Sequence, residues 1–475
     1  MRRALWINLS SDILFHFSRK FKQYSGISPK ELGCVEWIGS YDKAKTLFFL
    51  QEDFQVNDVE QPLWDALCPE WKIVKAPEPP LKLLLQVAGK TVFKVGETIP
   101  FELSLLLNGA PKAGAKVKYR ISNEEDGTVE GDVISGRTPA KLSTGLTRPG
   151  FALLTATYED LSGACGAAVE PERIEASPEI KGFDEFWTAQ KELLRKTPLR
   201  VLSKKRIPPE LQEFEGSVEV FDVQVACAGA APMSGILAMP KNARPHAHPA
   251  YLFFHGAGVR AAFQPLTWAA KGMLALNVNA HGLENDKPAS YYKNLENGAL
   301  KDYSGRIVDS PEQSPFRNMA LRAVRSVEYM KTLPEWDGRN IIVHGGSQGG
   351  WQALVAAALD KEVSFSVAAA PAMCNQAGAL TGRATSWPGI INGPASDPRG
   401  LRVAPFFDGV AFSRRIACKT LFSVGFSDQA ATPSSVYAAF NACGGNATMI
   451  DFPECGHAGA VFWMGESKIL HYAPS

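Results

Sequence analysis

The chain has 475 residues, with 50 Lys and Arg against 49 Asp and Glu, and 45% of its residues are hydrophobic. This length supports two or three domains with cores of their own. A formal net charge of +1 excludes a protein whose whole surface attracts a polyanion. No apolar run approaches the roughly 18 residues that a membrane-spanning helix needs. Polar residues interrupt the N-terminal apolar stretch, so we expect neither membrane insertion nor a secretory signal.

The eight cysteines are scattered, and none belongs to a C-x-x-C pair. This pattern is typical of free, mostly buried thiols in a reducing compartment. The nearest pair of metal-ligating side chains is His246-x-His248, in a Pro-flanked loop before a predicted strand. A solvated loop is the simpler interpretation of that pair. We therefore predict no metal site and no cofactor.

The first two of three regions show no chemical site. Residues 1–78 are rich in aromatic side chains and without a clear period, and a Pro-rich linker, 75–82, marks their end. Residues 79–170 alternate short apolar runs with Asn-Gly, Asp-Gly and Pro-Gly turns. This spacing predicts a small β-sandwich of immunoglobulin-like size. We expect this domain to serve packing or positioning, with carbohydrate binding as the alternative.

In the third region, residues 171–475, apolar runs alternate with helical segments, which predicts an α/β domain with a mostly parallel, doubly wound sheet. Helices are predicted over 316–333 and 348–359. Strands are predicted within 250–256, 272–282, 340–347, 363–371, 419–425 and 447–453. Because functional residues in such sheets lie just beyond the carboxyl ends of the strands, the search for a site starts there.

The strongest motif lies between a predicted strand and a predicted helix. Residues 345–349 read Gly-Gly-Ser-Gln-Gly and match G-x-S-x-G in this context. Glycines on both sides permit a tight turn that exposes the hydroxyl of Ser347, and the following helix directs its N-terminal N–H groups at an oxyanion. Ser347 is thus the predicted nucleophile. A serine in a purely structural turn is the alternative.

A nucleophilic serine needs a base and an acid, which follow it in the order Ser, Asp or Glu, His in the α/β-hydrolase fold. Only His457 and His471 come after Ser347, and His457 lies in a Gly-flanked loop directly after a predicted strand. Asp428 comes just after the preceding strand, whereas Asp451 lies inside its strand. We predict His457 as the base and Asp428 as the acid, with Asp451 as the rival.

An oxyanion hole requires two N–H donors. One is expected from the backbone of Gln348, the residue after the nucleophile. The other is expected from Ala257, in the His-Gly-Ala-Gly loop at 255–258 that follows a predicted strand. An ordinary Gly-rich turn is the alternative interpretation of that loop.

Together these residues resemble the acetyl xylan esterases and cephalosporin-C deacetylases of carbohydrate esterase family seven. The resemblance covers about residues 175–470. It rests on the stretches at 182–194, 255–256, 334–350, 425–428 and 456–457. It implies an α/β-hydrolase fold and a serine esterase that removes acetyl groups from small sugars and xylo-oligosaccharides without metal or cofactor. It also implies a cytoplasmic and often homo-oligomeric protein. By the resemblance, Ser347, Asp428 and His457 match the triad, and Ala257 and Gln348 match the oxyanion donors.

The chain departs from the family pattern at three places. Asn279-Ala280-His281-Gly282 replaces R-G-Q-G, Ala257 replaces a Tyr, and Ala458 replaces a Glu after the histidine. Backbone donation survives the change at 257, but substrate preference and oligomeric state are open. His281 is a candidate substrate contact, with stabilisation of the turn as the alternative. Trp387 is a candidate for stacking on a sugar ring, with packing under its loop as the alternative.

The N-terminal region carries a second, weaker resemblance. Residues 10–32 resemble the last helix-turn-helix of AraC-type transcription regulators, in an F-S-R-x-F-K core and a G-I-S-P-x-E tail. Only half of that family's DNA-binding unit is present, so a relic or fused fragment is expected rather than binding to nucleic acid. The alternatives to a carbohydrate deacetylase are therefore a broad small-ester hydrolase and a DNA-binding regulator with a hydrolase-like domain.

Overall fold

The computed structural model describes residues 81–462, except 125–126 and 230, together with three strands near the N-terminus. These are β1 (Ala4–Ile7), β2 (Val35–Asp42) and β3 (Lys45–Leu50), which pair antiparallel in the order β1-β3-β2. The sequence pattern had not indicated strands in this region. The segment that resembles a helix-turn-helix, residues 10–32, lies outside the described residues.

The predicted β-sandwich is present. A four-stranded sheet has the order β10-β6-β4, with β7 paired to β6, and a five-stranded sheet has the order β5-β12-β11-β8-β9. The bounds are β4 (Leu81–Val87), β5 (Val92–Phe93), β6 (Ile99–Leu107), β7 (Ala110–Pro111), β8 (Lys116–Ser122), β9 (Thr128–Ile134), β10 (Ala140–Thr144), β11 (Gly150–Tyr158) and β12 (Leu161–Val169). Alternate side chains of β6, among them Phe101 and Leu103, are buried in the core between the sheets, as expected for strands with one face inward.

A nine-stranded sheet forms the centre of the larger domain, in the order β13-β14-β15-β17-β16-β18-β19-β20-β21. All six predicted strands are confirmed, and they pair parallel from β17 to β21. The sequence pattern did not indicate the other three strands, β13, β14 and β15, which add an antiparallel edge to the sheet. The bounds are β13 (Val201–Ile207), β14 (Val218–Val225), β15 (Met233–Pro240), β16 (His248–Phe254), β17 (Leu274–Asn279), β18 (Trp336–Gly346), β19 (Phe365–Ala369), β20 (Lys419–Gly425) and β21 (Ala447–Phe452). This is the predicted α/β-hydrolase architecture.

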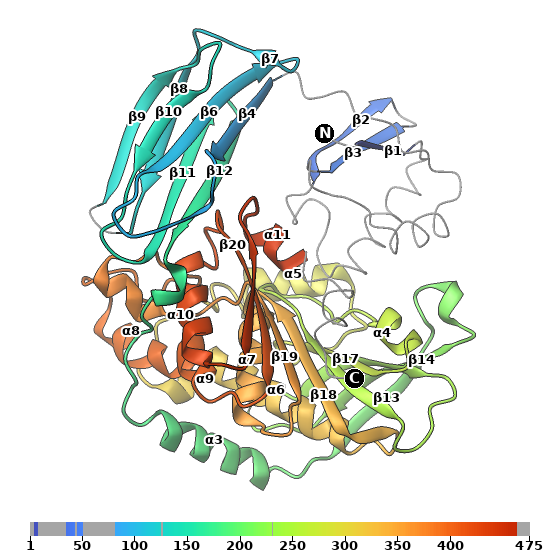
Figure 1. Cartoon of the computed structure of the whole chain (residues 1–475). Coiled ribbons are helices and arrows are strands. Elements are labelled where there is room, and N and C mark those ends of the chain that lie inside the picture. Colours follow the sequence, from blue (N-terminus) through green and yellow to red (C-terminus); the bar gives the residue numbers. More distant parts are fainter. Residues whose placement is uncertain are drawn as a thin grey trace.

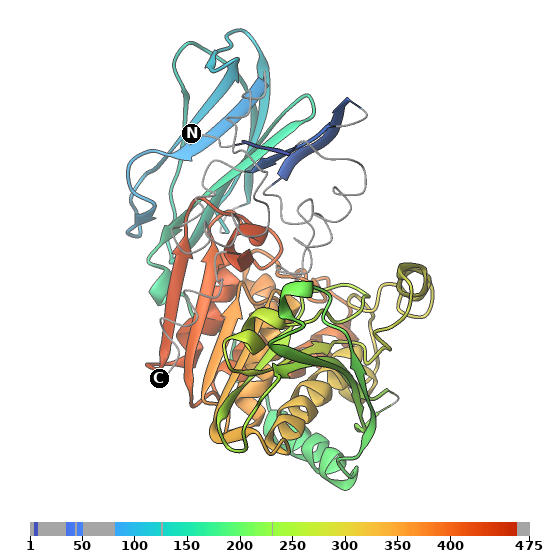
Figure 2. The same cartoon turned by 90° about the vertical axis from the view of Figure 1, so that its right-hand side faces the viewer.

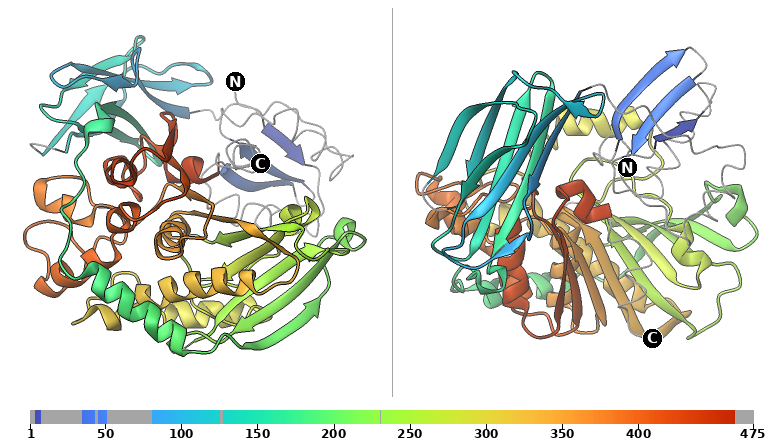
Figure 3. Two further views of the ribbon diagram at one scale, coloured as in Figure 1. Left: turned by 60° about the horizontal axis from the view of Figure 1, so that its bottom comes forward. Right: turned by 45° about the horizontal axis from the view of Figure 1, so that its top comes forward.

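Helices cover both faces of this sheet (Figures 1 and 3). The two helices predicted around the motif are confirmed as α6 (Pro315–Lys331) and α7 (Gln348–Leu359). The others are α3 (Phe183–Lys196), α4 (Leu266–Ala270), α5 (Ala289–Asn297), α8 (Pro398–Val403), α9 (Gly409–Ser413), α10 (Pro433–Cys443) and α11 (His457–Phe462), with short 3-10 turns η1 (Pro171–Arg173), η2 (Gln212–Phe214), η3 (Pro311–Gln313), η4 (Gln376–Thr381) and η5 (Ala404–Phe407). Among the described residues, no helix has both the length and the apolar character that a membrane crossing requires.

Strand β16 shows how the sheet separates two cores. Leu252 and Phe254 pack with α3, α6 and α7 on one face, and Tyr251 packs with α4 on the other. Because both faces are covered, the strand is an almost continuous apolar run rather than an alternating one. The carboxyl end of β16 therefore emerges from a rigid, close-packed layer.

The sandwich stands over the part of the sheet formed by β20 and β21, beside α11 (Figures 1 and 2). Strands β11 and β12 of the sandwich run antiparallel, and the start of β11 and the end of β12 lie at this end of the larger domain (Figure 1). The linker after β12 runs along α10, where Asn441 Nδ2 donates hydrogen bonds to the carbonyl oxygens of Pro171 and Ile174, at 3.1 and 2.9 Å. Specific hydrogen bonds thus fix the connection between the two domains to α10 of the larger domain.

Three buried imidazoles of the larger domain give a prediction for stability. Burial lowers the pKa of His344 to about 3, that of His255 to about 3 and that of His281 to about 4. In the unfolded chain a histidine titrates near 6.5, so the unfolded state binds more protons below that pH. Above about pH 6.5 the rings are neutral in both states, and their burial does not reduce the free energy of unfolding. That free energy falls by about 1.4 kcal/mol per ring and per pH unit as the pH drops toward 4.

We expect the urea midpoint of unfolding to fall between pH 7.5 and pH 5.0. Carboxylates also titrate in this window, so the informative quantity is the difference between variants. His281→Gln should show a smaller loss of unfolding free energy than the wild type, whereas His246→Gln, in an exposed loop, should match the wild type. Equal losses in all three proteins would contradict the prediction.

Candidate active site

Ser347 forms the turn between β18 and α7. Its backbone has φ 58° and ψ −123°, a region that L-residues rarely occupy and that costs about 1–3 kcal/mol. Hydrogen bonds to neighbouring backbone hold it there. The Ser347 N–H donates to the Ala369 oxygen at 2.9 Å, and the Ser347 oxygen accepts from Ala372 N–H at 3.1 Å. The side chain is partly exposed, as a nucleophile needs to be.

The glycines of the motif are there because the backbone leaves no room for side chains. A Cβ on Gly349 would overlap the carbonyl oxygen of Phe254, at the end of β16, and one on Gly345 would overlap the backbone of Gly349. The first turn of α7 is therefore pressed against the adjacent parallel strand. This contact orients the N-terminus of α7 toward the space above the carboxyl ends of the strands.

Asp428 and His457 lie together as predicted. His457 Nδ1 is 2.7 Å from Asp428 Oδ2, and the Asp428 side chain is fully buried. The other carboxylate oxygen, Oδ1, accepts from the backbone N–H groups of Ala430 and Ala431, at 2.8 and 2.9 Å. The carboxylate is thus fixed from both sides, and the His457 Nδ1–H donor leaves Nε2 free to accept a proton.

The rival acid is engaged elsewhere. Asp451, in β21, accepts a hydrogen bond from Tyr437 Oη at 2.7 Å, and burial raises its pKa. The geometry therefore supports Asp428 rather than Asp451 as the partner of His457. His471 lies outside the described residues.

Helix α11 brings His457 to the nucleophile turn. Its Val461 side chain fills the space that a Cβ on Gly346 would occupy, one residue before Ser347. The Ser423 hydroxyl, on β20, donates to the Ala460 oxygen at 2.8 Å. The helix that begins at His457 is therefore anchored to β20 and to the residue that precedes the nucleophile.

The predicted oxyanion loop also reaches Ser347. A Cβ built on Gly256 would lie 3.6 Å from Ser347 Cβ, and Ala257 beside it is exposed. Gly258 has φ 129°, which favours glycine because it lies in the positive-φ region. The loop that carries Ala257 thus lies beside the nucleophile.

Tyr303, which the sequence reasoning did not single out, joins the two oxyanion segments. Its hydroxyl accepts from Gly258 N–H at 3.3 Å and donates to Gln348 Oε1 at 2.7 Å. Burial raises its pKa to about 12, so the hydroxyl keeps its proton at neutral pH. Tyr303 lies in an irregular loop 45 residues from either partner, and no local motif marks it.

The candidate substrate contact His281 is buried, with its ring edge-on to Tyr303 at a centroid distance of 4.6 Å. Its turn is held by Asn279 Oδ1, which accepts from the N–H groups of His281 and Leu283, and by Arg322, which donates to the Ala280 oxygen at 2.9 Å. These contacts hold the backbone of the turn and do not involve the imidazole, so the turn-stabilising alternative also stays a prediction. Contact of His281 with a substrate stays a prediction.

Trp387 is half-buried and packs edge-on against Phe316, with ring centroids 6.1 Å apart. Its backbone N–H donates to the Ala430 oxygen at 2.8 Å, and its own oxygen accepts from Met373 N–H at 2.9 Å. The loop of Trp387 therefore braces the segment after Asp428. Stacking of its ring on a sugar stays a prediction.

Within the part of the chain that the structure describes, no group of three or more His, Cys, Asp or Glu side chains is arranged to hold a metal ion. His248 is engaged with backbone groups: its Nε2 accepts from Arg244 N–H at 3.0 Å, and its Nδ1 lies 2.7 Å from the Gly272 oxygen. None of the described cysteines forms a disulfide.

Comparisons with known proteins identify the family of this chain. The acetyl xylan esterase family model matches residues 172–473. The acetyl esterase Axe7A of Xylanibacter ruminicola is 28% identical over 371 residues, which covers 74% of this chain and 80% of that protein. The acetyl xylan esterase of Paenibacillus sp. R4 superposes with a TM-score of 0.53 at 24% identity, over 61% of this chain and 93% of the other.

Acetyl xylan esterase 1 of Thermoanaerobacterium sp. superposes with a TM-score of 0.50 at 20% identity, over 61% of this chain and 92% of the other. At these identities the two solved structures support the fold alone. The match to the family covers more than half of the chain and includes both the nucleophile turn and the Asp428–His457 pair. The chain therefore belongs to the acetyl xylan esterase family and is a carboxylic ester hydrolase with the α/β-hydrolase fold.

Proposed function

We propose that this protein is a serine esterase that removes acetyl groups from xylo-oligosaccharides or related sugars, with Ser347, His457 and Asp428 as its triad. The observation that carries the proposal is the 2.7 Å contact between His457 Nδ1 and the buried Asp428 carboxylate, in a chain whose family is defined by acetyl ester hydrolysis. The strained Ser347 turn, on to which α11 packs, supplies the nucleophile.

In the first half of the reaction, Ser347 Oγ attacks the carbonyl carbon of the acetyl ester while His457 Nε2 takes the hydroxyl proton. The negative charge that develops on the carbonyl oxygen is met by the N–H groups of Gln348 and Ala257 and by the N-terminus of α7. The tetrahedral intermediate then collapses. The C–O bond to the sugar breaks, and His457 returns the proton to the sugar oxygen.

In the second half, a water molecule attacks the acetyl-enzyme, with His457 again as the base, and acetate leaves from Ser347. Asp428 keeps the imidazole in the Nδ1–H tautomer and stabilises the imidazolium in both halves. The structure fixes the carboxylate with two backbone N–H groups, so it need not reorganise as charge moves.

The substrate class is tested by acetate release from a panel of acetylated mono-, oligo- and polysaccharides, beside simple esters of increasing acyl length. We expect the acetylated sugars to be the faster substrates. Faster hydrolysis of long-chain simple esters than of every acetylated sugar would favour the broad small-ester hydrolase instead.

Ser347→Ala should abolish acetate release, because it deletes the attacking oxygen. Loss of the nucleophile typically lowers kcat by a factor of about 10⁶. Ser203→Ala, on the exposed face of edge strand β13, serves as the matched control. A fluorophosphonate probe should label the wild type and the control, but not Ser347→Ala. Labelling or activity that survives the substitution would place the nucleophile elsewhere.

Asp428→Asn should lower kcat by a factor on the order of 10⁴, because an amide in this position favours the wrong tautomer of His457. Asp451→Asn is the matched control, since Asp451 contacts Tyr437 rather than the histidine. Initial rates with 4-nitrophenyl acetate compare the two variants directly. A larger loss in Asp451→Asn would overturn the assignment of the acid.

Tyr303→Phe should lower kcat by about tenfold, less than the loss of a direct oxyanion donor, because it frees Gly258 N–H and Gln348 Oε1 together. KM for 4-nitrophenyl acetate should change little, since this hydroxyl is already engaged by Gly258 N–H and Gln348 Oε1. Tyr291→Phe, in neighbouring α5, is the control. Equal kcat values in both variants would contradict a role for Tyr303 in aligning the oxyanion donors.

A further inference from the structure

The sandwich rests directly on the segment that carries the acid. In β12, a Cβ on Gly166 would overlap the carbonyl oxygen of Phe426, two residues before Asp428. In β11, the ring of Phe151 lies edge-on to the ring of Phe426 at 5.3 Å and packs against Tyr437 of α10 at 5.7 Å. The two domains therefore meet within two residues of the proposed catalytic acid.

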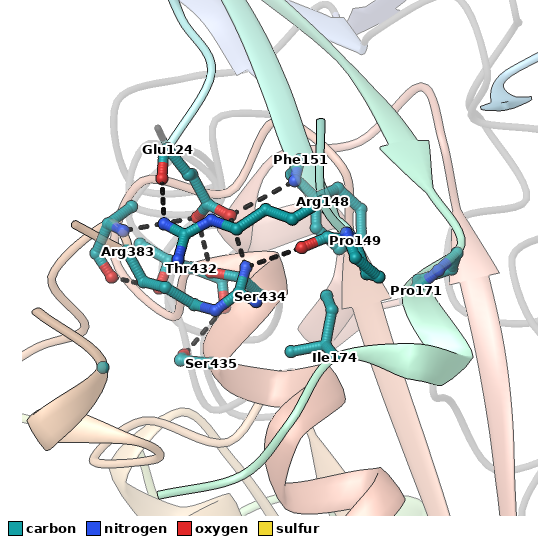
Figure 4. A network of polar contacts seen from close by, with 12 residues as sticks. Glu124, Arg148, Pro149, Phe151, Pro171, Ile174, Arg383, Thr432, Ser434 and Ser435 are labelled. Carbon is teal, nitrogen blue, oxygen red and sulfur yellow. Dashed lines mark hydrogen bonds and ion pairs between the residues drawn. The ribbon is translucent and has the colours of Figure 1, made fainter. Parts of the chain in front are cut away.

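A buried carboxylate of the sandwich lies at the centre of this interface (Figure 4). Glu124 follows β8, and its side chain is 6% exposed. The carboxylate accepts from four groups: the N–H groups of Phe151 and Ala384, at 3.2 and 3.3 Å, the hydroxyl of Ser434, and Arg383 Nη1 at 3.4 Å. All but the first come from the larger domain, so Glu124 ties loop 381–388 and the start of α10 to the sandwich.

Two arginines extend this contact in opposite directions. Arg148 of the sandwich donates to the Thr381 oxygen at 2.8 Å, and also to the backbone oxygen of Glu124. Arg383 of the larger domain donates to the Pro149 oxygen at 2.9 Å. Each domain thus supplies an arginine whose guanidinium donates to a backbone oxygen of the other domain. Burial raises the pKa of the Glu124 carboxyl above its usual value. The hydrogen bond from the Ser434 hydroxyl and the charge of Arg383 oppose this effect but do not cancel it.

A series of hydrogen bonds connects the residues that Glu124 binds to Asp428. The Thr432 hydroxyl donates to the Ala384 oxygen at 3.2 Å, which joins the two segments that Glu124 binds. Trp387 N–H, in the first segment, donates to the Ala430 oxygen at 2.8 Å. Ala430 and its neighbour Ala431 then donate their N–H groups to Asp428 Oδ1. The N–H groups that bind the Asp428 carboxylate therefore belong to a segment that the sandwich contacts at both ends, at Phe426 and at Ser434.

We propose that the β-sandwich is a positioning element of the active site, in which Glu124 and the Gly166–Phe426 contact hold the segment 426–434 so that Asp428 faces His457. Glu124 is a positioning residue rather than a catalytic one, because it acts through this segment. The inference rests on the proposed function, which assigns the acid to Asp428. It gives the sandwich a task in the esterase reaction without any contact with substrate.

The sharpest variant is Glu124→Gln. Every partner of the Glu124 carboxylate is a hydrogen-bond donor. A carboxamide of the same shape places its NH₂ group against some of these donors, so at least one hydrogen bond is lost. A displacement of a catalytic group by about 1 Å costs up to about a hundredfold in rate. We expect kcat for 4-nitrophenyl acetate to fall between about tenfold and about a hundredfold, with KM nearly unchanged. Ser434→Ala removes one donor from the other side, and its loss should be smaller.

The readout that separates positioning from general stability is the proton on His457 Nδ1. A proton held between a histidine and a buried carboxylate gives a far-downfield NMR signal, and its loss in Asp428→Asn identifies it. In Glu124→Gln this signal should broaden or disappear at temperatures where the protein is folded by circular dichroism. Glu130→Gln makes the same change at an exposed ion pair of β9 with Arg120, and should keep both the signal and the wild-type kcat.

The outcomes are distinct. A lowered kcat together with a lost or broadened signal supports the inference, and Ser434→Ala gives the same comparison if Glu124→Gln does not fold. A wild-type kcat in Glu124→Gln, or a lowered kcat with an unchanged signal, overturns it. A wild-type enzyme without ester hydrolysis or without the signal contradicts the proposed function itself, before any variant is compared.

Discussion

The active site depends on one close approach between two backbone segments. Gly349, in the first turn of α7, lies so near the carbonyl oxygen of Phe254 that no Cβ fits between them. Because Phe254 ends β16 and leads into the loop 255–258, this contact fixes the nucleophile turn and the oxyanion loop relative to each other. The strain at Ser347 persists because the flanking parallel strands over-determine its position. A larger residue at 349 would separate two functional elements at once.

The parts of the site that the sequence predicted are those with a local signature. Ser347 was predicted because strand, glycine-flanked turn and helix follow one another within a few residues, and the structure places the start of α7 at Gln348 as expected. Asp428 and His457 were predicted from chain order and from their position just after strands. The 2.7 Å contact between them agrees with both choices. The sequence already favoured Asp428 over Asp451, because Asp451 lies inside its strand, and the hydrogen bond between Asp451 and Tyr437 agrees with that choice.

The parts that the sequence did not indicate depend on contacts between distant segments. Tyr303 and Glu124 lie in irregular loops, and nothing in their neighbours distinguishes them from surface residues. The antiparallel edge was missed for another reason: β13 is exposed along almost its whole length, with Lys and Arg side chains, and carries no apolar period. Such a strand protects a sheet edge from pairing with other chains, and its charged pattern resembles that of a loop.

The interface between the domains also has a consequence for how the chain is made. The contacts of Arg148 with Thr381 and of Glu124 with Ser434 join residues 233 and 310 positions apart. During synthesis the sandwich is complete before the larger domain, and the ring of Phe151 lacks its partners Phe426 and Tyr437 until more than two hundred further residues have been added. Contacts of such long range form slowly, because a large loop must close before they are made. The sandwich therefore has no docking partner until Phe426 and Tyr437 have been added, and Asp428 and His457 can come together only when the last strands of the sheet are present.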